Sequence, residues 1–254
     1  MSTGIEISLG EVAAALALVA VAVVVSLYVR ADLERDIGIA VVRSFIQLTA
    51  IGYVIQLIFD EDSLLLVFAL IAVMVAFSTY TARSRAAKVP GATLPLALGL
   101  ALAAVATLGL VVALGIFEPE ARFLVPVGGM VVGNAMTASA VALNRLGDEF
   151  EDGRGRIEAA LALGANAREA ALPAVRRSLR SGTITLVDST KTTGLIFFPG
   201  TMVGMLLAGA DPIDAVRLQL ILLYVLLGSV AISALVSTSL AYRGFFTSEH
   251  QLRE

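Results

Sequence analysis

Five polar side chains interrupt apolar stretches of this 254-residue sequence, at Arg43, Gln47, Asn134, Asp188 and Lys191. Ionisable and amide groups are costly in apolar surroundings unless they have a partner, so these residues are candidates for a path that carries a polar solute. Arg43 and Gln47 are four residues apart and share a helix face, while Asp188 and Lys191, three apart, can form an ion pair. Structural roles are the alternative, because Arg43 can extend to a membrane surface and Gln47 can bond to a neighbouring helix.

The stretch "GLIFFPGTMVG", residues 194–204, is a second candidate for the solute path. Pro199 lacks an amide hydrogen, and Gly194 and Gly200 allow the backbone to bend, so we expect a helix that is kinked or interrupted near mid-membrane. A broken helix exposes carbonyl oxygens that can line a path, and Met202 adds a thioether there. Proline kinks are also ordinary structural features of membrane helices.

Side chains that bind metals are scarce. The sequence has no cysteine, and its one histidine, His250, lies near the end of the chain. Carboxylates favour hard ions and thioethers favour soft ones, and methionines also serve as adaptable packing. The remaining candidate donors are Asp188, Met130, Met136, Met202 and Met205. Their spacing defines no closed site, so the metal ligands are unknown.

The composition indicates where these side chains lie. The chain is 58% hydrophobic and 15% charged, with a mean hydropathy of +0.89, which is more apolar than an ordinary soluble domain. Apolar runs of about 20 residues cross a membrane as helices, and backbone hydrogen bonding excludes open sheets there. We therefore predict an all-α integral membrane protein with a single transmembrane domain over residues 1–254. Seven spans are expected, at about 9–29, 38–59, 64–82, 92–117, 123–143, 183–209 and 213–241.

The loops between the expected spans alternate in charge. Of the 18 Lys and Arg residues, 14 lie after the first, third and fifth spans or in the C-terminal tail. The other loops are rich in Asp and Glu, so the positive-inside rule predicts an external N-terminus and a cytoplasmic C-terminus. The same rule places the long polar segment 144–182 on the cytoplasmic side.

The segment 144–182 has the pattern of two helices around a glycine. A run of strong helix formers ends near Gly164, and a second helical run begins near Asn166. We expect a helix, a glycine turn and another helix at the membrane surface. From composition alone, the segment can equally be an amphipathic linker that lies on anionic headgroups.

The order of residues within this segment favours a more specific role. Glu158, Ala159 and Ala160 precede Gly164, and Pro173 follows. This order resembles the EAA-x-x-x-G coupling loop of ATP-binding-cassette permeases, in which a short helix docks on a nucleotide-binding subunit. Small alanines allow close approach, the glycine permits a tight turn, and the glutamate can pair with a basic residue of the partner. The spacing after the glycine is shorter than in the importer pattern.

The likeness extends over most of the chain. It is carried by "PVGGMVVGNAMTASAVALNRL" (126–146), "EAALALGANAREAALPAVRRSLR" (158–180), "GLIFFPGTMVGMLLAGADPIDAVRLQL" (194–220) and "YRGFFTS" (242–248). Together these segments resemble the UPF0014-like family of permeases typified by the FetB iron-export protein and by plant aluminium-tolerance transporters. Members of that family are associated with iron export or metal tolerance, and plant relatives have been linked to nucleotide sugar. The sequence departs from the family pattern at Phe197, Phe198 and Thr201, which leaves the substrate open.

The resemblance implies a multi-pass permease subunit of the inner (cytoplasmic) membrane that exports iron or another metal ion. In that family a separate ATP-binding-cassette ATPase supplies the energy, so ATP and Mg are expected on the partner and no cofactor on this chain. The sequence contains no G-x-x-x-x-G-K-[ST] motif, and we do not expect it to be an enzyme. A homodimer in contact with membrane lipid is expected, with no nucleic-acid partner. The alternatives are a secondary transporter driven by an ion gradient and a non-transporting membrane scaffold.

Overall fold

Helices make up most of the described chain in the computed structural model, which describes residues 9–61, 63–247, 249 and 251–253. In chain order the helices are α1 (Leu9–Val29), α2 (Glu34–Glu61), α3 (Leu64–Arg85), α4 (Thr93–Ala113), α5 (Ala121–Asp152), α6 (Arg154–Ala162), α7 (Ala167–Thr192), α8 (Gly200–Leu207), α9 (Pro212–Ala241) and the short 3-10 helix η1 (Tyr242–Phe245).

Within the described residues, six helices are long and apolar enough to cross a membrane: α1, α2, α3, α4, α5 and α9. The prediction of an all-α integral membrane protein is confirmed at this level. The count of seven spans is not confirmed, and the external N-terminus and cytoplasmic C-terminus stay predictions. The expected span over 183–209 accounts for the difference, because α7 ends at Thr192 and α8 begins only at Gly200.

The helices that flank the polar segment are longer than the sequence patterns predict. We expected a span to end at 143 and another to begin at 183, but α5 continues to Asp152 and α7 begins at Ala167. Polar residues do not by themselves end a helix. α5 stops only at Gly153, and α7 starts directly after the capping residue Asn166. Two long helices therefore supply much of the segment that we expected to be a separate surface element.

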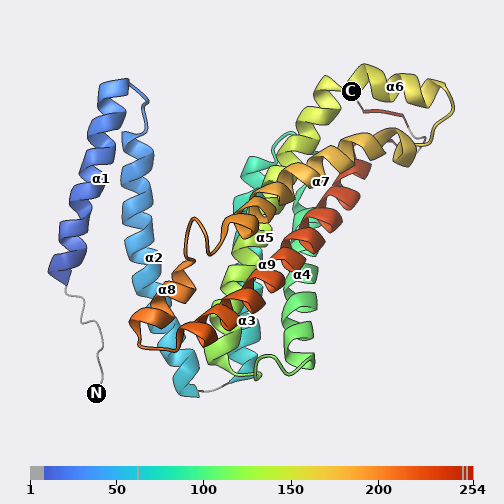
Figure 1. Ribbon diagram of the computed structural model, residues 1–254. Helices are drawn as coiled ribbons and strands as arrows, with labels where there is room; N and C mark the ends of the chain where they lie inside the picture. The colour runs from blue at the N-terminus through green and yellow to red at the C-terminus, as the bar shows by residue number, and fades with distance from the viewer. Residues whose placement is uncertain (1–8, 62, 248, 250, 254) are drawn as a thin grey trace.

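α5 lies at the centre of a bundle with α3, α4, α7 and α9 (Figure 1). Small residues allow these helices to approach closely. A Cβ atom on Gly99 of α4 would collide with Ser237 Oγ of α9. A Cβ atom on Gly182 of α7 would lie 2.5 Å from the carbonyl oxygen of Ala138 and 2.7 Å from Cβ of Ala142, both on α5. The backbones of α5 and α7 are thus in contact where they cross.

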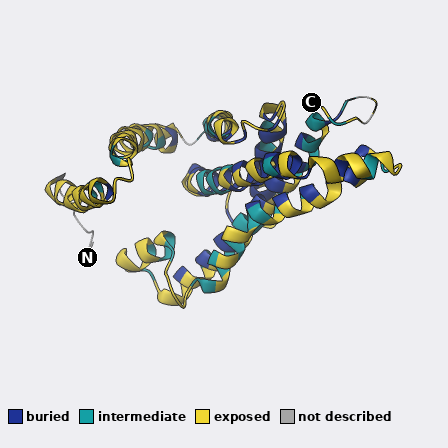
Figure 2. Ribbon diagram, turned by 90° about the horizontal axis from the view of Figure 1, so that it is seen from above, coloured by how far each residue is buried: buried dark blue, intermediate teal, exposed yellow. Residues whose placement is uncertain are grey.

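α1 and α2 form a hairpin beside this bundle (Figure 1). Ser26 Oγ donates to Glu34 Oε1 at 2.8 Å and accepts from the amide of Leu33 at 3.1 Å, which closes the turn between the two helices. Figure 2 shows the hairpin with mostly exposed residues, whereas the buried ones gather in the bundle. Two described residues of the hairpin are buried: Ser26, at the turn, and Ile58, near the end of α2. Ile58 lies in an apolar cluster with residues of α3, α4 and α5. The hairpin therefore rests on the bundle near one end of α2.

Candidate functional site

The predicted helix, glycine turn and helix are confirmed as a structural unit. α6 ends at Ala162, Gly164 has a φ of +95°, and α7 follows. This left-handed backbone conformation favours glycine because it has no Cβ atom. Asn166 and Glu169 form a capping box, in which each side chain accepts a hydrogen bond of 3.0 Å from the backbone amide of the other. In Figure 1 the unit lies at the outer end of the bundle, far from α8.

The residues of the coupling-loop pattern lie mainly on the surface of this unit. Glu158 is exposed, and its Oε1 accepts a hydrogen bond of 2.9 Å from Arg154 Nε within α6. Ala159 and Gly164 are exposed, Ala160 is half-buried, and Pro173 is exposed on α7. Leu163, which the pattern did not single out, is 90% exposed at the turn. A charge, a small-residue face and an apolar side chain are thus open to contact with another molecule.

The helix that we expected to be interrupted around Pro199 is interrupted. α7 ends at Thr192, Gly194 turns the chain with a φ of +86°, and the amide of Gly194 donates to the carbonyl of Phe197 at 2.9 Å. Pro199 then occupies the N-cap position of α8, and Gly200 is the first residue of that helix. Leu195 is 91% exposed and Met202 is half-buried. The segment 193–199 therefore forms a break with exposed apolar side chains.

The other polar residues of the predicted path lie on separate helices. Asp188 Oδ1 and Lys191 Nζ, both exposed on α7, form the expected ion pair at 2.9 Å. Asn134 Nδ2 donates to the carbonyl of Met130 at 2.9 Å within α5, so its amide is satisfied by its own helix. Arg43 and Gln47 share an exposed part of α2. Among the described residues, the side chains of these five polar residues form no hydrogen bond or ion pair between α2, α5 and α7.

Metal-binding groups do not cluster in the described part of the chain. Residues 9–61, 63–247, 249 and 251–253 contain no group of three His, Asp or Glu side chains placed to hold a metal ion. His250 lies outside the described residues. The metal ligands of the sequence analysis therefore stay unknown.

The comparison with known proteins assigns the chain to a family. The family described as "Uncharacterised protein family (UPF0014)" matches residues 9–246. The chain belongs to this family. The UPF0014 membrane protein STAR2 of Oryza sativa subsp. japonica is 39% identical over 95% of this chain and 85% of its own length. No solved structure matches.

Two further relatives of this UPF0014 chain have informative names. The protein ALUMINUM SENSITIVE 3 of Arabidopsis thaliana is 38% identical over 95% of this chain and 88% of its own length. The probable iron export permease protein FetB of Escherichia coli (strain K12) is 34% identical over 95% of this chain and 93% of its own length. The family resemblance of the sequence is thus confirmed, and the family is one of membrane proteins.

Sequence patterns missed the residue that supports the α6–turn–α7 unit of this UPF0014 chain. Glu149, on the last turns of α5, has only 5% of its side chain exposed. Its carboxylate pairs with Arg145 Nη2 of α5 at 2.6 Å and with Arg177 Nη2 of α7 at 2.6 Å. Arg145 four residues earlier was a visible signal, but Arg177 is 28 residues away in the chain. This ion-pair network joins the first half of α7 to the end of α5.

The C-terminal segment after η1 was also missed as part of this surface. The rings of Phe150 and Phe245 stack at 4.1 Å between centroids, and Phe246 packs edge-on against Phe150 at 5.7 Å. Leu252 opposes Phe246 in an isolated β-bridge. A hollow of about 480 Å³ is lined by Glu158 of α6, by Gly164 of the following turn, and by Gln251 and Leu252. The segment thus lies beside the exposed face of α6.

The loop between α3 and α4 is tied to the same end of α5. Lys88 Nζ lies 2.8 Å from Asp148 Oδ1 and 2.8 Å from Glu151 Oε2. These two carboxylates accept hydrogen bonds from the ammonium group and raise the pKa of Lys88 above its ordinary value. Ion pairs therefore join the end of α5 both to α7, through Glu149, and to the α3–α4 loop, through Lys88.

Proposed function

We propose that this UPF0014 chain is the permease subunit of an ATP-binding-cassette exporter for iron or another metal ion. The observation that carries the proposal is the coupling unit, which consists of α6, the Gly164 turn and the first turns of α7. It exposes Glu158 and Leu163 at the end of the bundle and is braced on α5 through Glu149. The name of the relative FetB, a probable iron export permease, supports iron as the substrate.

A separate ATPase subunit would supply the energy, binding ATP and Mg on its own chain. In this proposal Glu158 pairs with a basic residue of the ATPase, while Leu163 and the small residues of α6 fill a groove on it. Two copies of the permease in the inner (cytoplasmic) membrane, surrounded by lipid, enclose the path. Closure of the ATPases on ATP then moves α6 relative to the bundle.

α7 is the element that would transmit this movement. It is 26 residues long and so extends about 39 Å without interruption from the coupling turn to the break at 193–199. A displacement at Asn166 therefore reaches Thr192 through one rigid helix. We propose that the break, with its free carbonyl oxygens, opens and closes the solute path around the ends of α7 and α8.

The side chains of the predicted path have distinct roles in this proposal. The carboxylate of Asp188 lies near the end of α7 at the break. In this proposal a metal cation competes with Lys191 for that carboxylate. Pro199 and Gly200 keep the break open, and Met202 lies in the first turn of α8, directly after it. Arg43 and Asn134 line other parts of the path on α2 and α5.

Transport into inside-out vesicles tests the proposal. Vesicles that contain this chain and the ATPase expressed with it are given radioactive iron and ATP, and uptake is measured. We expect ATP-dependent uptake in the natural chain, and its loss in Glu158→Arg, because a positive charge there repels the basic partner. Glu118→Arg, which changes an exposed carboxylate at the connection between α4 and α5, is the matched control and should transport normally.

The other outcomes separate the alternatives. ATP hydrolysis that depends on this chain without iron uptake keeps the permease and rejects iron as substrate. Uptake that requires an ion gradient and ignores ATP identifies a secondary transporter. A chain that binds a partner but supports neither uptake nor ATP hydrolysis is a scaffold.

A further inference from the structure

The second half of α7 is polar where its neighbours are apolar. Residues 182–192 read "GTITLVDSTKT". At 26 residues α7 is long enough to cross a membrane, but it is not among the six described helices that are also apolar enough. It nevertheless packs on α5 and α9, which both belong to those six (Figure 1). A polar helix therefore lies against two apolar ones.

Contacts with α5 show the level at which this half of α7 lies. Arg177 pairs with Glu149, and Gly182 lies against Ala138, so the two helices run in opposite directions. Residues 123–143 of α5 contain no charged side chain, which makes them the part of that helix suited to the hydrocarbon core. The part of α7 that follows Gly182 extends alongside this uncharged stretch.

The outer face of this half of α7 carries charge. Thr185, Asp188 and Lys191 follow one another at three-residue intervals, so they lie on one side of the helix, and all three are exposed. The side chains of Asp188 and Lys191, which pair at 2.9 Å, are 59% and 66% exposed. Asp188 lies six residues beyond Gly182, or about 9 Å along the axis. Charged groups at this level are costly against lipid.

Other exposed helix surfaces of the chain suit lipid. α1 exposes Leu18 and Val24, and α4 exposes Leu102 and Val105. α4 contains no charged residue at all. Lipid can therefore cover these helices, whereas the outer face of α7 needs protein or water beside it.

Two observations favour a second copy of this chain as the occupant. An ATPase bound at the coupling turn is too far away, because Asp188 lies 22 residues, or about 33 Å, along α7 from Asn166. The face is also self-complementary in charge. Two copies related by a two-fold axis bring the same face together, so Asp188 of each copy can pair with the partner's Lys191.

We propose that the outer face of α7 around Thr185, Asp188 and Lys191 faces the same surface of a second copy in the membrane. The inference rests on the proposed function only for the presence of two copies. It adds the surface through which they meet, and it brings two Asp188 carboxylates to the axis beside the break at 193–199.

Cysteine cross-linking tests the contact, because the natural chain has no cysteine. Thr185→Cys is expressed with the ATPase, the membranes are treated with a bifunctional maleimide, and the cross-linked dimer is measured on a denaturing gel. Thiols that face each other across an axis react at high effective concentration, so we expect roughly tenfold more dimer than from a control cysteine on another face.

The control position is matched for depth. Gly99 of α4 lies against Ser237, whose hydroxyl group donates to Ser139 of α5 at 3.4 Å, next to the residue that Gly182 touches. Gly99 and Gly182 therefore lie at the same level. Leu102 is three residues beyond Gly99, as Thr185 is beyond Gly182, and it is 49% exposed. Leu102→Cys should give little dimer.

A change of charge tests the self-complementary pairing. Asp188→Lys in the Thr185→Cys chain brings only positive charges to the axis, so we expect roughly tenfold less cross-linked dimer. Asp214→Lys in the same chain breaks an equally exposed pair with Arg217 on α9 and should leave the yield unchanged. The amount of chain in the membranes is measured for each variant, so that the yields are compared at equal expression.

The outcomes separate this proposal from the proposed function. The α7 contact is overturned if Leu102→Cys gives as much dimer as Thr185→Cys, if neither gives dimer, or if Thr185→Cys cross-links only to another protein. ATP-dependent iron uptake alongside any of these results keeps the exporter and rejects only the contact. Dimer from Thr185→Cys in vesicles that take up no iron supports the contact and rejects iron export.

Discussion

The two ends of α7 differ in how the rest of the chain holds them. From the Gly164 turn to Gly182, past the middle of the helix, a capping box, the Glu149 network and the close contact of Gly182 with α5 fix α7. At the other end, the Asp188–Lys191 pair is exposed and the chain leaves the helix at Thr193. A long helix that is fixed near one end and lightly held at the other can carry a displacement. Each of the following substitutions tests this contrast beside a matched control substitution.

The largest effect is expected where α7 touches α5. Gly182→Leu places a side chain against the carbonyl oxygen of Ala138 and Cβ of Ala142, so the helices must separate. We expect a loss of about 3 kcal/mol of stability, measured by thermal unfolding in detergent. Gly204→Leu in α8 has no atom within 4 Å of the new Cβ and should unfold near the natural temperature. Equal losses in both variants would contradict the contrast.

The buried ion pair should matter more than the exposed one. Glu149→Gln leaves two half-exposed arginines without their carboxylate, and we expect a cost of about 2 kcal/mol. Asp188→Asn removes an exposed pair and should change stability by less than about 0.5 kcal/mol. Thermal unfolding of both variants at the same salt concentration gives the comparison. A Glu149 variant as stable as the Asp188 variant would mean that the network does not brace α7.

The turn after α7 requires glycine at position 194, whereas position 200, at the start of α8, tolerates other residues. Gly194→Ala forces a Cβ atom into a conformation with a φ of +86°, which costs about 1.5 kcal/mol. Gly200→Ala, at the start of α8 with open space around it, should be neutral or slightly stabilising. Limited proteolysis at 193–199 should be faster in the Gly194 variant and unchanged in the other.

The smallest effect concerns the helix cap at the coupling turn. Asn166→Ala removes the oxygen that accepts from the amide of Glu169, and a loss of about 1 kcal/mol follows. Asn144→Ala, an exposed position inside α5, is the control and should have no measurable effect. Hydrogen exchange at the first amides of α7 provides the readout. Unchanged exchange in the Asn166 variant would show that tertiary contacts alone hold this end.

Local signals in the sequence predicted the coupling turn and the break. Gly164 and Pro199 act on their own backbone, and the pair Asn166 and Glu169 acts over three residues, so a single sequence is enough to locate them. The helical run that begins near Asn166 was predicted correctly, but the span boundaries at 143 and 183 were wrong because polarity was taken as a boundary. α5 continues to Gly153, and the run from Asn166 continues to Thr192 as one helix.

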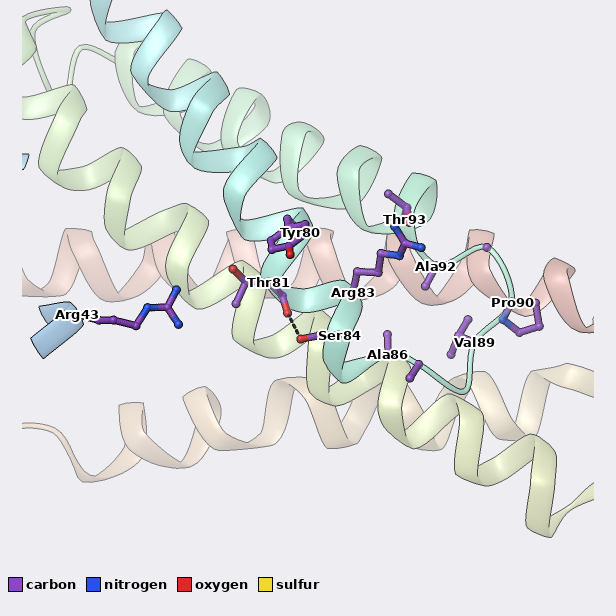
Figure 3. A pocket seen from close by; sticks show the side chains of 12 residues that line it. Arg43, Tyr80, Thr81, Arg83, Ser84, Ala86, Val89, Pro90, Ala92 and Thr93 are labelled. Carbon is purple, nitrogen blue, oxygen red and sulfur yellow. Dashed lines mark hydrogen bonds between the residues drawn. The ribbon is translucent and has the colours of Figure 1, made fainter. Parts of the chain in front are cut away.

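Contacts between distant parts of the chain were not predictable in this way. Arg177 meets Glu149, and Phe245 meets Phe150, only because the bundle brings α7 and η1 to the end of α5. The local sequence around Glu149 and Phe150 does not predict that Arg177 and Phe245 are their partners. The cavity of about 820 Å³ that Arg43 of α2 and Arg83 of α3 line (Figure 3) likewise forms only because tertiary packing brings α2 beside α3.

The length of α5 has a consequence for the membrane itself. At 32 residues the helix extends about 48 Å, well beyond a hydrocarbon core of about 30 Å. An untilted α5 therefore projects into water, and α6 follows directly after its projecting end. The height of α6 above the lipid then depends on bilayer thickness and helix tilt. In a thin membrane α6 would lie farther from the lipid surface, and in a thick one it would lie closer. The lipid composition of the cell therefore affects how far α6 extends toward a docking partner.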